Sequence, residues 1–241
     1  RPERIPLSFS QERLWFIDQL EGTVPYHLPS VLRLKGNLNK EALQYALKSL
    51  IHRHEVLRTI IGEKEGQPYQ SIRDSNEWDL CITDGIIYSE DNEALKRYIQ
   101  QLINTPFDLS KDYMVRAMLI NLSEEDHILV VTVHHIASDG WSIPIITREL
   151  AELYDSFDQR RHPSLPSLPI QYADYAIWQR AYMQGEVLNK KIAYWKDKLY
   201  GVSPLQLPVD YSRPVIQGTK GTVAFSEVDK ALPKQLQQLS R

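Results

Sequence analysis

Two adjacent histidines followed by an aspartate are the residues of this sequence best suited to acid–base chemistry. His134 ends the run 127–134, His135 follows it directly, and Asp139 lies in the short loop that comes next. A neutral imidazole can accept or return a proton near neutral pH, and a nearby carboxylate can hold the loop in place. The pattern therefore favours a functional site at this point of the chain. The alternative is a packed pair of core histidines followed by an ordinary Asp-Gly turn.

The elements that must position these residues are a buried strand and a helix. The run 127–134 is apolar and rich in β-branched residues, which is typical of a strand buried on both faces. After the loop, Ser142 is a suitable N-cap and Pro144 is tolerated in a first turn, so a helix should begin there. A loop between a strand and a helix is a common location for functional residues.

Because side chains alternate along a strand, His134 and His135 should face opposite sides. One of them can then point into a cavity, and the other must be packed and hydrogen-bonded. Asp139 is close enough in sequence for its carboxylate to fold back beneath the strand end. Gly140 permits a positive φ or the close approach of another backbone. A metal site would need a further ligand at a recognisable spacing, and the sequence offers none nearby.

Composition places the chain among ordinary globular proteins. It has 241 residues, is 42% hydrophobic and 24% charged, and carries a net charge of −3. This balance gives no reason to expect nucleic acid or a membrane as a partner, and no apolar run approaches the ~20 residues of a membrane span. Cys81 is the single cysteine and cannot form an internal disulfide, which fits a reducing cytoplasm. The chain begins at Arg1 rather than Met, as a piece of a longer protein would.

Apolar periodicity predicts alternating helices and strands without a βαβ rhythm, which favours an α+β fold with a mixed or antiparallel sheet flanked by helices. Helices are predicted over 8–20, 39–53, 92–103, 142–157, 170–185, 186–200 and 231–239, and strands over 30–35, 56–61, 69–72, 80–83, 115–122, 127–134 and 222–227. The strands 115–122 and 127–134 should form an antiparallel hairpin. The proline-rich stretch 163–169 should be an extended linker and a lobe boundary.

Two other polar or aromatic groups have structural interpretations when taken alone. Arg53, His54 and Arg58 fit a solvated helix end and a strand face. The aromatic residues of 172–182 fit a core face better than a ligand cage, because aromatic side chains dominate buried area.

Four stretches taken together resemble the first four signature motifs of the condensation domains of non-ribosomal peptide synthetases. They are 8–15, 53–59, 134–142 and 172–180, and they occur in the family's order. The first two stretches look most like domains that accept an L-configured upstream residue. The heterocyclising subtype is disfavoured, because it places aspartate where His134 and His135 stand.

The resemblance implies a chloramphenicol-acetyltransferase-like fold, with two similar lobes arranged in a V around a tunnel. Upstream and downstream peptidyl carrier proteins would dock at its two mouths, beside an adenylation domain. Each carrier would present an acyl group on a 4'-phosphopantetheine thioester, and the domain itself would bind no cofactor. The amine of the downstream aminoacyl group would attack the upstream thioester to form an amide.

The resemblance also implies roles for individual residues. His135 would be the catalytic residue. Asp139 would hold the loop through an arginine, and Gly140 would lie at the tunnel centre. The remaining residues of the active-site motif and its structural support would be His134, Trp141 and Arg58.

The chain has about half the usual length of this family, and the later motifs are missing. We therefore expect 1–169 to be the N-terminal lobe with the active-site loop, and 170–241 to be inter-lobe helices and the start of the C-terminal lobe. Two alternatives stay open. His134 and Asp139 also fit the H-x-x-x-x-D spacing of glycerolipid acyltransferases, which use a hydroxyl acceptor. The chain could instead be a non-catalytic docking platform for carrier proteins.

Overall fold

The structure is a computed structural model that describes residues 1–22, 24–212, 226, 229 and 231–240. Two compact units are present, Arg1–Tyr200 and Gly201–Arg241. The second unit contains helix α7 (Ala231–Leu239), as predicted, whereas the predicted strand 222–227 lies outside the described residues except for position 226. The units divide after position 200, and the predicted division of a longer domain into lobes at 169/170 stays a prediction.

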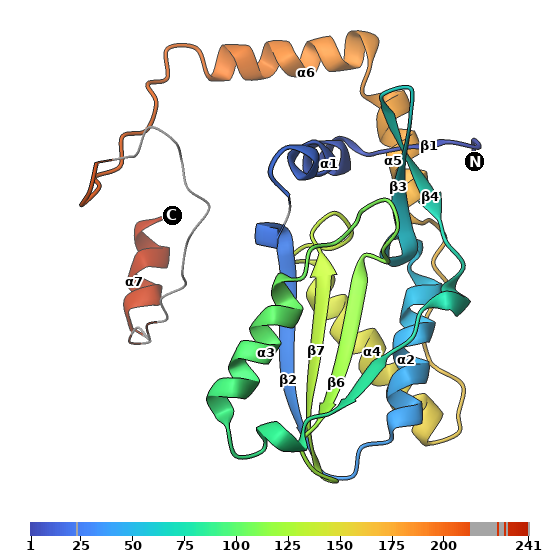
Figure 1. The fold of residues 1–241 in the computed structure, drawn as a ribbon. Helices are drawn as coiled ribbons and strands as arrows, with labels where there is room; N and C mark the ends of the chain where they lie inside the picture. Colours follow the sequence, from blue (N-terminus) through green and yellow to red (C-terminus); the bar gives the residue numbers. More distant parts are fainter. Residues whose placement is uncertain (23, 213–225, 227–228, 230, 241) are drawn as a thin grey trace. The chain divides into compact units, whose positions relative to one another are not determined.

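The first unit contains two β-sheets (Figure 1). A four-stranded sheet has the order β2 (His27–Lys35), β7 (Asp126–His134), β6 (Val115–Asn121) and β5 (Cys81–Asp84), and a three-stranded sheet has the order β1 (Ile5–Pro6), β4 (Gln67–Ile72) and β3 (Thr59–Lys64). β7 is antiparallel to both β2 and β6, which confirms the predicted hairpin, and β5 is parallel to β6. The α+β class is confirmed.

The helices of this unit follow the predicted pattern closely. They are α1 (Phe9–Glu21), α2 (Lys40–Arg53), α3 (Asn92–Asn104), α4 (Ser142–Asp158), α5 (Tyr172–Tyr182) and α6 (Gly185–Lys198), with short 3₁₀ turns η1 (Val24–Tyr26), η2 (Glu55–Arg58), η3 (Ser75–Glu77) and η4 (Ile86–Tyr88). The Ser8 hydroxyl accepts from Gln11 N at 3.2 Å, and the Gln11 side chain accepts from Ser8 N at 3.0 Å. This reciprocal capping box fixes the start of α1.

Two predicted strand boundaries were wrong. β2 begins at His27 rather than at position 30, because it pairs with β7 along its whole length, from His27 opposite His134 to Lys35 opposite Asp126. The stretch 56–61 begins as the turn η2, in which Leu57 N donates to the His54 carbonyl, and becomes strand β3 only at Thr59. Tertiary pairing and a local turn override β propensity at these points.

Helices cover both faces of the four-stranded sheet (Figure 1). On the face covered by α2 and α4, Leu129 and Val133 of β7 join a core with Leu47 and Leu50 of α2. On the other face, Ile128 and Val130 pack with Leu95 of α3 and its neighbours. β7 is therefore apolar on both sides because each side meets helices, as its composition predicted.

The predicted core role of the α5 aromatic residues was wrong. Ala173 and Ala176 form the buried face of α5, which contacts β1, and these small residues allow the backbones to approach closely. Tyr175, Trp178 and Tyr182 are 38%, 55% and 45% exposed. Neighbouring rings of this series instead contact one another, with the Trp178 and Tyr182 rings stacked at 5.2 Å. The stretch 163–169 has no helix or strand, as expected for a linker.

Candidate active site

The two histidines at the end of β7 face opposite ways. His134 is fully buried, with ring centroids 5.6 Å from Phe107 and 6.0 Å from His27, and its Nδ1 accepts from Ile136 N at 3.1 Å. His135 is exposed, and its ring lines a cavity of about 530 Å³. Strand alternation thus places one imidazole in the core and the other in the cavity, as predicted.

Burial decides the charge of His134. Desolvation, helped by the nearby imidazole of His27, lowers the pKa of His134 from 6.5 to about 4. The ring is therefore neutral near pH 7 and closed from the cavity. His135 is therefore the imidazole of the pair that lines the cavity. The H-x-x-x-x-D pairing of His134 with Asp139 gains no support, because the His134 ring is buried.

Asp139 caps the helix that follows the loop. Its Oδ1 accepts from Ser142 Oγ at 2.7 Å, Ser142 N at 3.0 Å and Trp141 N at 3.1 Å. The prediction that Ser142 is the N-cap was wrong, because Ser142 is the first residue of α4 and Trp141 holds the N-cap position. The Ser142 N–H and hydroxyl both donate to the Asp139 carboxylate. The Ser142 hydrogen bond lowers the pKa of Asp139. The side chain is exposed, so it stabilises the loop as a cap and not as a buried charge.

Replacing Asp139 with alanine is expected to lower the free energy of unfolding by about 1 kcal/mol, the usual cost of losing an N-cap. Urea denaturation of both proteins at pH 7 measures this difference. Asp139→Asn keeps the oxygen acceptor and should recover most of the loss. A loss of about 3 kcal/mol or more for Asp139→Ala, the range typical of breaking a buried ion pair, would contradict the cap assignment.

Gly140, Trp141 and Arg58 are not among the described residues that line the cavity. Gly140 has no positive φ, and a Cβ added there would meet no described atom within 4 Å, so neither predicted need for glycine is present among the described residues. Trp141 is 87% exposed. Arg58 donates to the carbonyls of Arg73 at 2.5 Å and His52 at 3.4 Å, and thereby links the end of α2 to the segment after β4.

The cavity wall is built from segments far apart in the sequence. The residues that line it are Ser10, Gln11, Arg13, Leu14, His54, Val56, His135–Asp139, Ser142, Leu168, Ile170, Gln171, Tyr172 and Tyr175. The Tyr172 hydroxyl lies 2.9 Å from Ser8 Oγ, which joins α5 to the start of α1. Burial raises the pKa of Tyr172, so this phenol is neutral near pH 7. All four motif stretches therefore contribute to one site.

Sequence reasoning missed a buried ion pair at the cavity edge. Glu149 is 4% exposed and accepts from His54 Nε2 at 2.6 Å and from Arg53 Nε at 3.0 Å. Burial tends to raise the pKa of Glu149, but the hydrogen bonds from His54 and Arg53 lower it below its ordinary value. The available signal was the position of Glu149 between Ile146 and Leu153 on the inward face of α4, where a carboxylate requires a partner.

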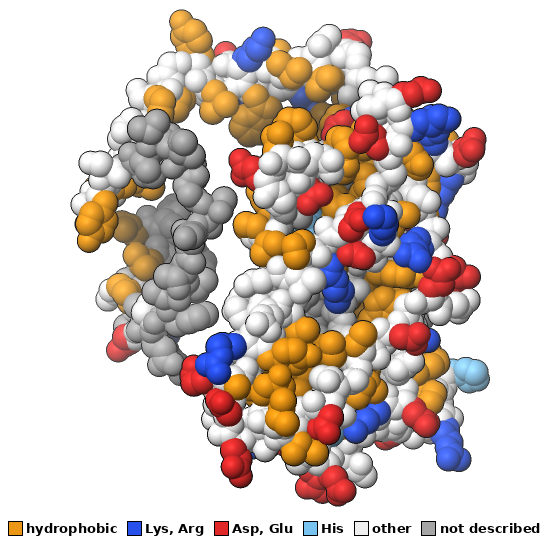
Figure 2. Space-filling model, in the orientation of Figure 1, with side chains coloured by type: hydrophobic (Ala, Val, Ile, Leu, Met, Phe, Trp, Pro, Cys, Tyr) orange, Lys and Arg blue, Asp and Glu red, His pale blue; other side chains and the backbone are white. Residues whose placement is uncertain are grey.

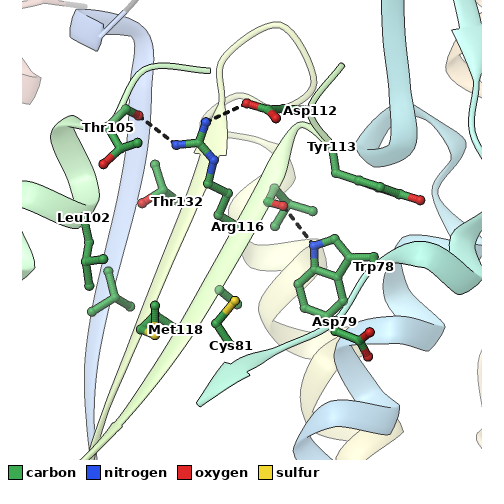
Figure 3. A pocket seen from close by; sticks show the side chains of 13 residues that line it. Trp78, Asp79, Cys81, Leu102, Thr105, Asp112, Tyr113, Arg116, Met118 and Thr132 are labelled. Atoms are coloured by element: carbon green, nitrogen blue, oxygen red, sulfur yellow. Dashed lines mark hydrogen bonds and ion pairs between the residues drawn. The ribbon is translucent and has the colours of Figure 1, made fainter. Parts of the chain in front are cut away.

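A second cavity, of about 300 Å³, lies on the α3 side of the four-stranded sheet (Figure 3). Hydrophobic side chains gather on this face of the molecule (Figure 2). The Arg116 guanidinium at its edge is held by the carbonyls of Thr105 and Pro106 and by Asp112. None of the predicted site residues lines this cavity in the described part of the chain.

Two further classes of feature are absent from the described residues. No group of three or more His, Cys, Asp or Glu residues there could hold a metal ion. None of the helices there combines the length and the apolar composition of a membrane span.

Comparisons with known proteins agree with the interpretation of the motifs. The family model of the Condensation domain matches residues 2–241. The chain is 41% identical over its full length to one of the linear gramicidin synthase subunits of Brevibacillus parabrevis and 37% identical to the dimodular nonribosomal peptide synthase of Bacillus subtilis (strain 168). It spans only 5% and 10% of these two proteins.

Solved structures show the same relationship. The X-domain from teicoplanin biosynthesis is 35% identical, with a TM-score of 0.76 over 90% of this chain and 48% of the X-domain chain. The starter condensation domain of rhizomide synthetase has a TM-score of 0.73 over 83% of this chain at 17% identity, which indicates a shared fold. This chain covers 49% of that one, so it spans about half the length of the solved domains it matches. On these grounds, with four motifs gathered around one cavity, the chain belongs to the condensation domain family of the non-ribosomal peptide synthetases.

Proposed function

We propose that the protein carrying this chain forms amide bonds between acyl groups tethered to two carrier proteins. The observation that carries this proposal is the exposed imidazole of His135, which directly follows the buried strand β7 and lines a cavity of about 530 Å³ between the four motif segments. The cavity would receive both thioesters on 4'-phosphopantetheine arms. The domain would supply no cofactor of its own.

In the proposed reaction the downstream amine attacks the upstream thioester carbonyl, a C–N bond forms and the C–S bond breaks. His135 accepts the proton that nitrogen loses and returns it to the departing sulfur. The thioester is already activated, so holding the two tethered groups together would provide the larger part of the acceleration, ~7 kcal/mol or more. The growing peptide then resides on the downstream carrier protein.

The proposal extends to partners and organisation. The partners would be an upstream and a downstream peptidyl carrier protein and an adjacent adenylation domain, in the cytoplasm. Residues 1–169 would form the N-terminal lobe, and 170–241 would lead into a second lobe that completes the tunnel. The resemblance of 8–15 and 53–59 to L-accepting domains supports an L-configured donor residue.

The test uses the full protein with its two carrier proteins, each loaded with an aminoacyl thioester. Mass spectrometry of the downstream carrier should detect a dipeptidyl thioester, and an L-configured donor should react faster than its D-enantiomer. An acceptor carrying a hydroxyl in place of the amine should give little ester. Transfer to the hydroxyl in preference to the amine would identify another acyltransferase, and carrier binding without transfer would identify a docking platform.

A further inference from the structure

We propose that His54 is a second imidazole of the cavity, which takes the proton that converts the α-ammonium of the downstream aminoacyl group into the attacking amine. This inference rests on the proposed function. It assigns the removal of the ammonium proton, which the role proposed for His135 does not include. The pair of His54 and the buried Glu149 carboxylate carries it.

The geometry fixes which nitrogen of His54 is available. Nε2 lies 2.6 Å from Glu149 Oε2, and a carboxylate can only accept, so Nε2 carries the hydrogen and donates. In the neutral imidazole Nδ1 is then the acceptor. The His54 backbone is fixed as the C-cap of α2, where its N–H donates to the Leu50 carbonyl at 3.0 Å. The ring is therefore held in one tautomer and one position at the cavity wall.

The His54 side chain lies between a buried carboxylate and solvent. The Glu149 side chain is 5% exposed and already accepts from Arg53, whose NH2 also donates to the Pro166 carbonyl at 2.6 Å. Glu149 Oε2 thus lies between the Arg53 guanidinium at 3.0 Å and the His54 ring at 2.6 Å. The His54 side chain is 20% exposed, which gives a proton a route to water.

Other titratable groups lie near this pair. The cavity is also lined by Arg13 of α1, His135 and Asp139 of the loop, and Tyr172 and Tyr175 of α5. Glu55, which follows His54, is paired with Arg1 at 2.5 Å, and Arg1 also binds Asp174. Among these groups, Asp139 already accepts hydrogen bonds at the start of α4, and Glu55 is paired with Arg1. The two histidines are the groups best placed to exchange protons with a substrate.

The stoichiometry of the reaction calls for two proton acceptors. An α-ammonium must lose one proton to become a nucleophile and a second as the C–N bond forms. Sulfur takes up one proton when the C–S bond breaks, and the other leaves for solvent. A neutral imidazole can accept only one proton. His135 would carry the proton that moves to sulfur, and His54 the proton that moves to solvent.

The test is the pH dependence of His54→Gln in the full protein with loaded carriers. Glutamine can still donate to Glu149 but cannot take a proton. Because an α-amine has a pKa of about 7.7–8.0, the ammonium predominates at pH 7 and the free amine at pH 9. We expect amide formation to fall by about five- to tenfold at pH 7, where roughly a tenth of the amine is free, and by less than about threefold at pH 9.

His52→Gln is the matched control. His52 lies in the last turn of α2, two residues before His54, and binds Ser75 Oγ at 2.9 Å. It is not among the described residues that line the cavity. The variant should retain the wild-type rate at both pH values. Glu149→Gln, which loses the anion, should show the same pH-dependent deficit as His54→Gln if the latter folds poorly in thermal unfolding. A deficit of equal size at pH 7 and pH 9 in both variants would overturn the role, as would an equal loss in His52→Gln.

The two proposals fail in different ways. A wild-type protein that forms no amide would overturn the proposed function and this role with it. A wild-type protein that forms amide, with His54→Gln as fast as wild type at pH 7, would overturn this role alone.

Discussion

His135→Ala is expected to lower the rate of amide formation by about 100-fold or more, the range found when a positioned acid–base group is removed. The free energy of unfolding should change little. The ring is exposed, and the hydrogen bond from His135 N to the Tyr26 carbonyl at 2.9 Å belongs to the backbone, which alanine retains. Single-turnover assays with loaded carriers measure the rate, and urea denaturation measures the stability.

His134→Ala is the comparison that separates the two histidines. It removes a fully buried ring between Phe107 and His27, so it should lower stability by about 2 kcal/mol or more, as large-to-small core substitutions do. An unchanged rate for His135→Ala would remove the chemistry assigned to that residue. A large stability loss for His135→Ala would indicate that its ring is a packing element.

Most of the fold could be predicted because local patterns and tertiary packing agree. The strand β7 packs against helices on both faces, so its apolar composition matches its burial on both sides. Ser8 and Gln11 mark the start of α1 through contacts only three residues apart. The opposite orientations of His134 and His135 follow from strand geometry alone.

The errors arose where long-range partners decide the outcome. The aromatic residues of α5 match a core stripe in composition, yet β1 meets the alanine face of that helix. Glu149 lies 95 residues from His54, so no local pattern joins them. Gly140 was expected to serve a positive φ or a close approach, and the described structure has neither. The motif stretches indicated segments that line the cavity, and the three-dimensional structure was needed to identify which of their side chains line it.

The second large expected effect is a fall in the free energy of unfolding at acidic pH. The pKa of His134 is lowered by burial from 6.5 to about 4, so the folded protein binds fewer protons than the unfolded chain between these values. Stability is therefore complete above pH 6.5 and is lost as pH falls toward 4. The full loss from this residue is about 3 kcal/mol, at 1.36 kcal/mol for each pH unit, and about 2 kcal/mol should be lost by pH 5. His27, whose pKa is also lowered by burial, adds in the same direction.

Urea denaturation at pH 7.5, 6, 5 and 4 measures this loss. Carboxylates with lowered pKa values, such as Asp108 and Glu152 at about 2, lose their contribution to stability mainly below pH 4.5. The loss of stability between pH 6.5 and pH 4.5 is therefore assigned to His134 and His27. His134→Asn cannot titrate, and although it should be less stable at pH 7.5, its stability should fall less steeply across that window. Equal stability of the wild-type protein at pH 7.5 and pH 5 would mean that His134 is charged in the fold, which is incompatible with the core position that leaves His135 as the imidazole of the cavity.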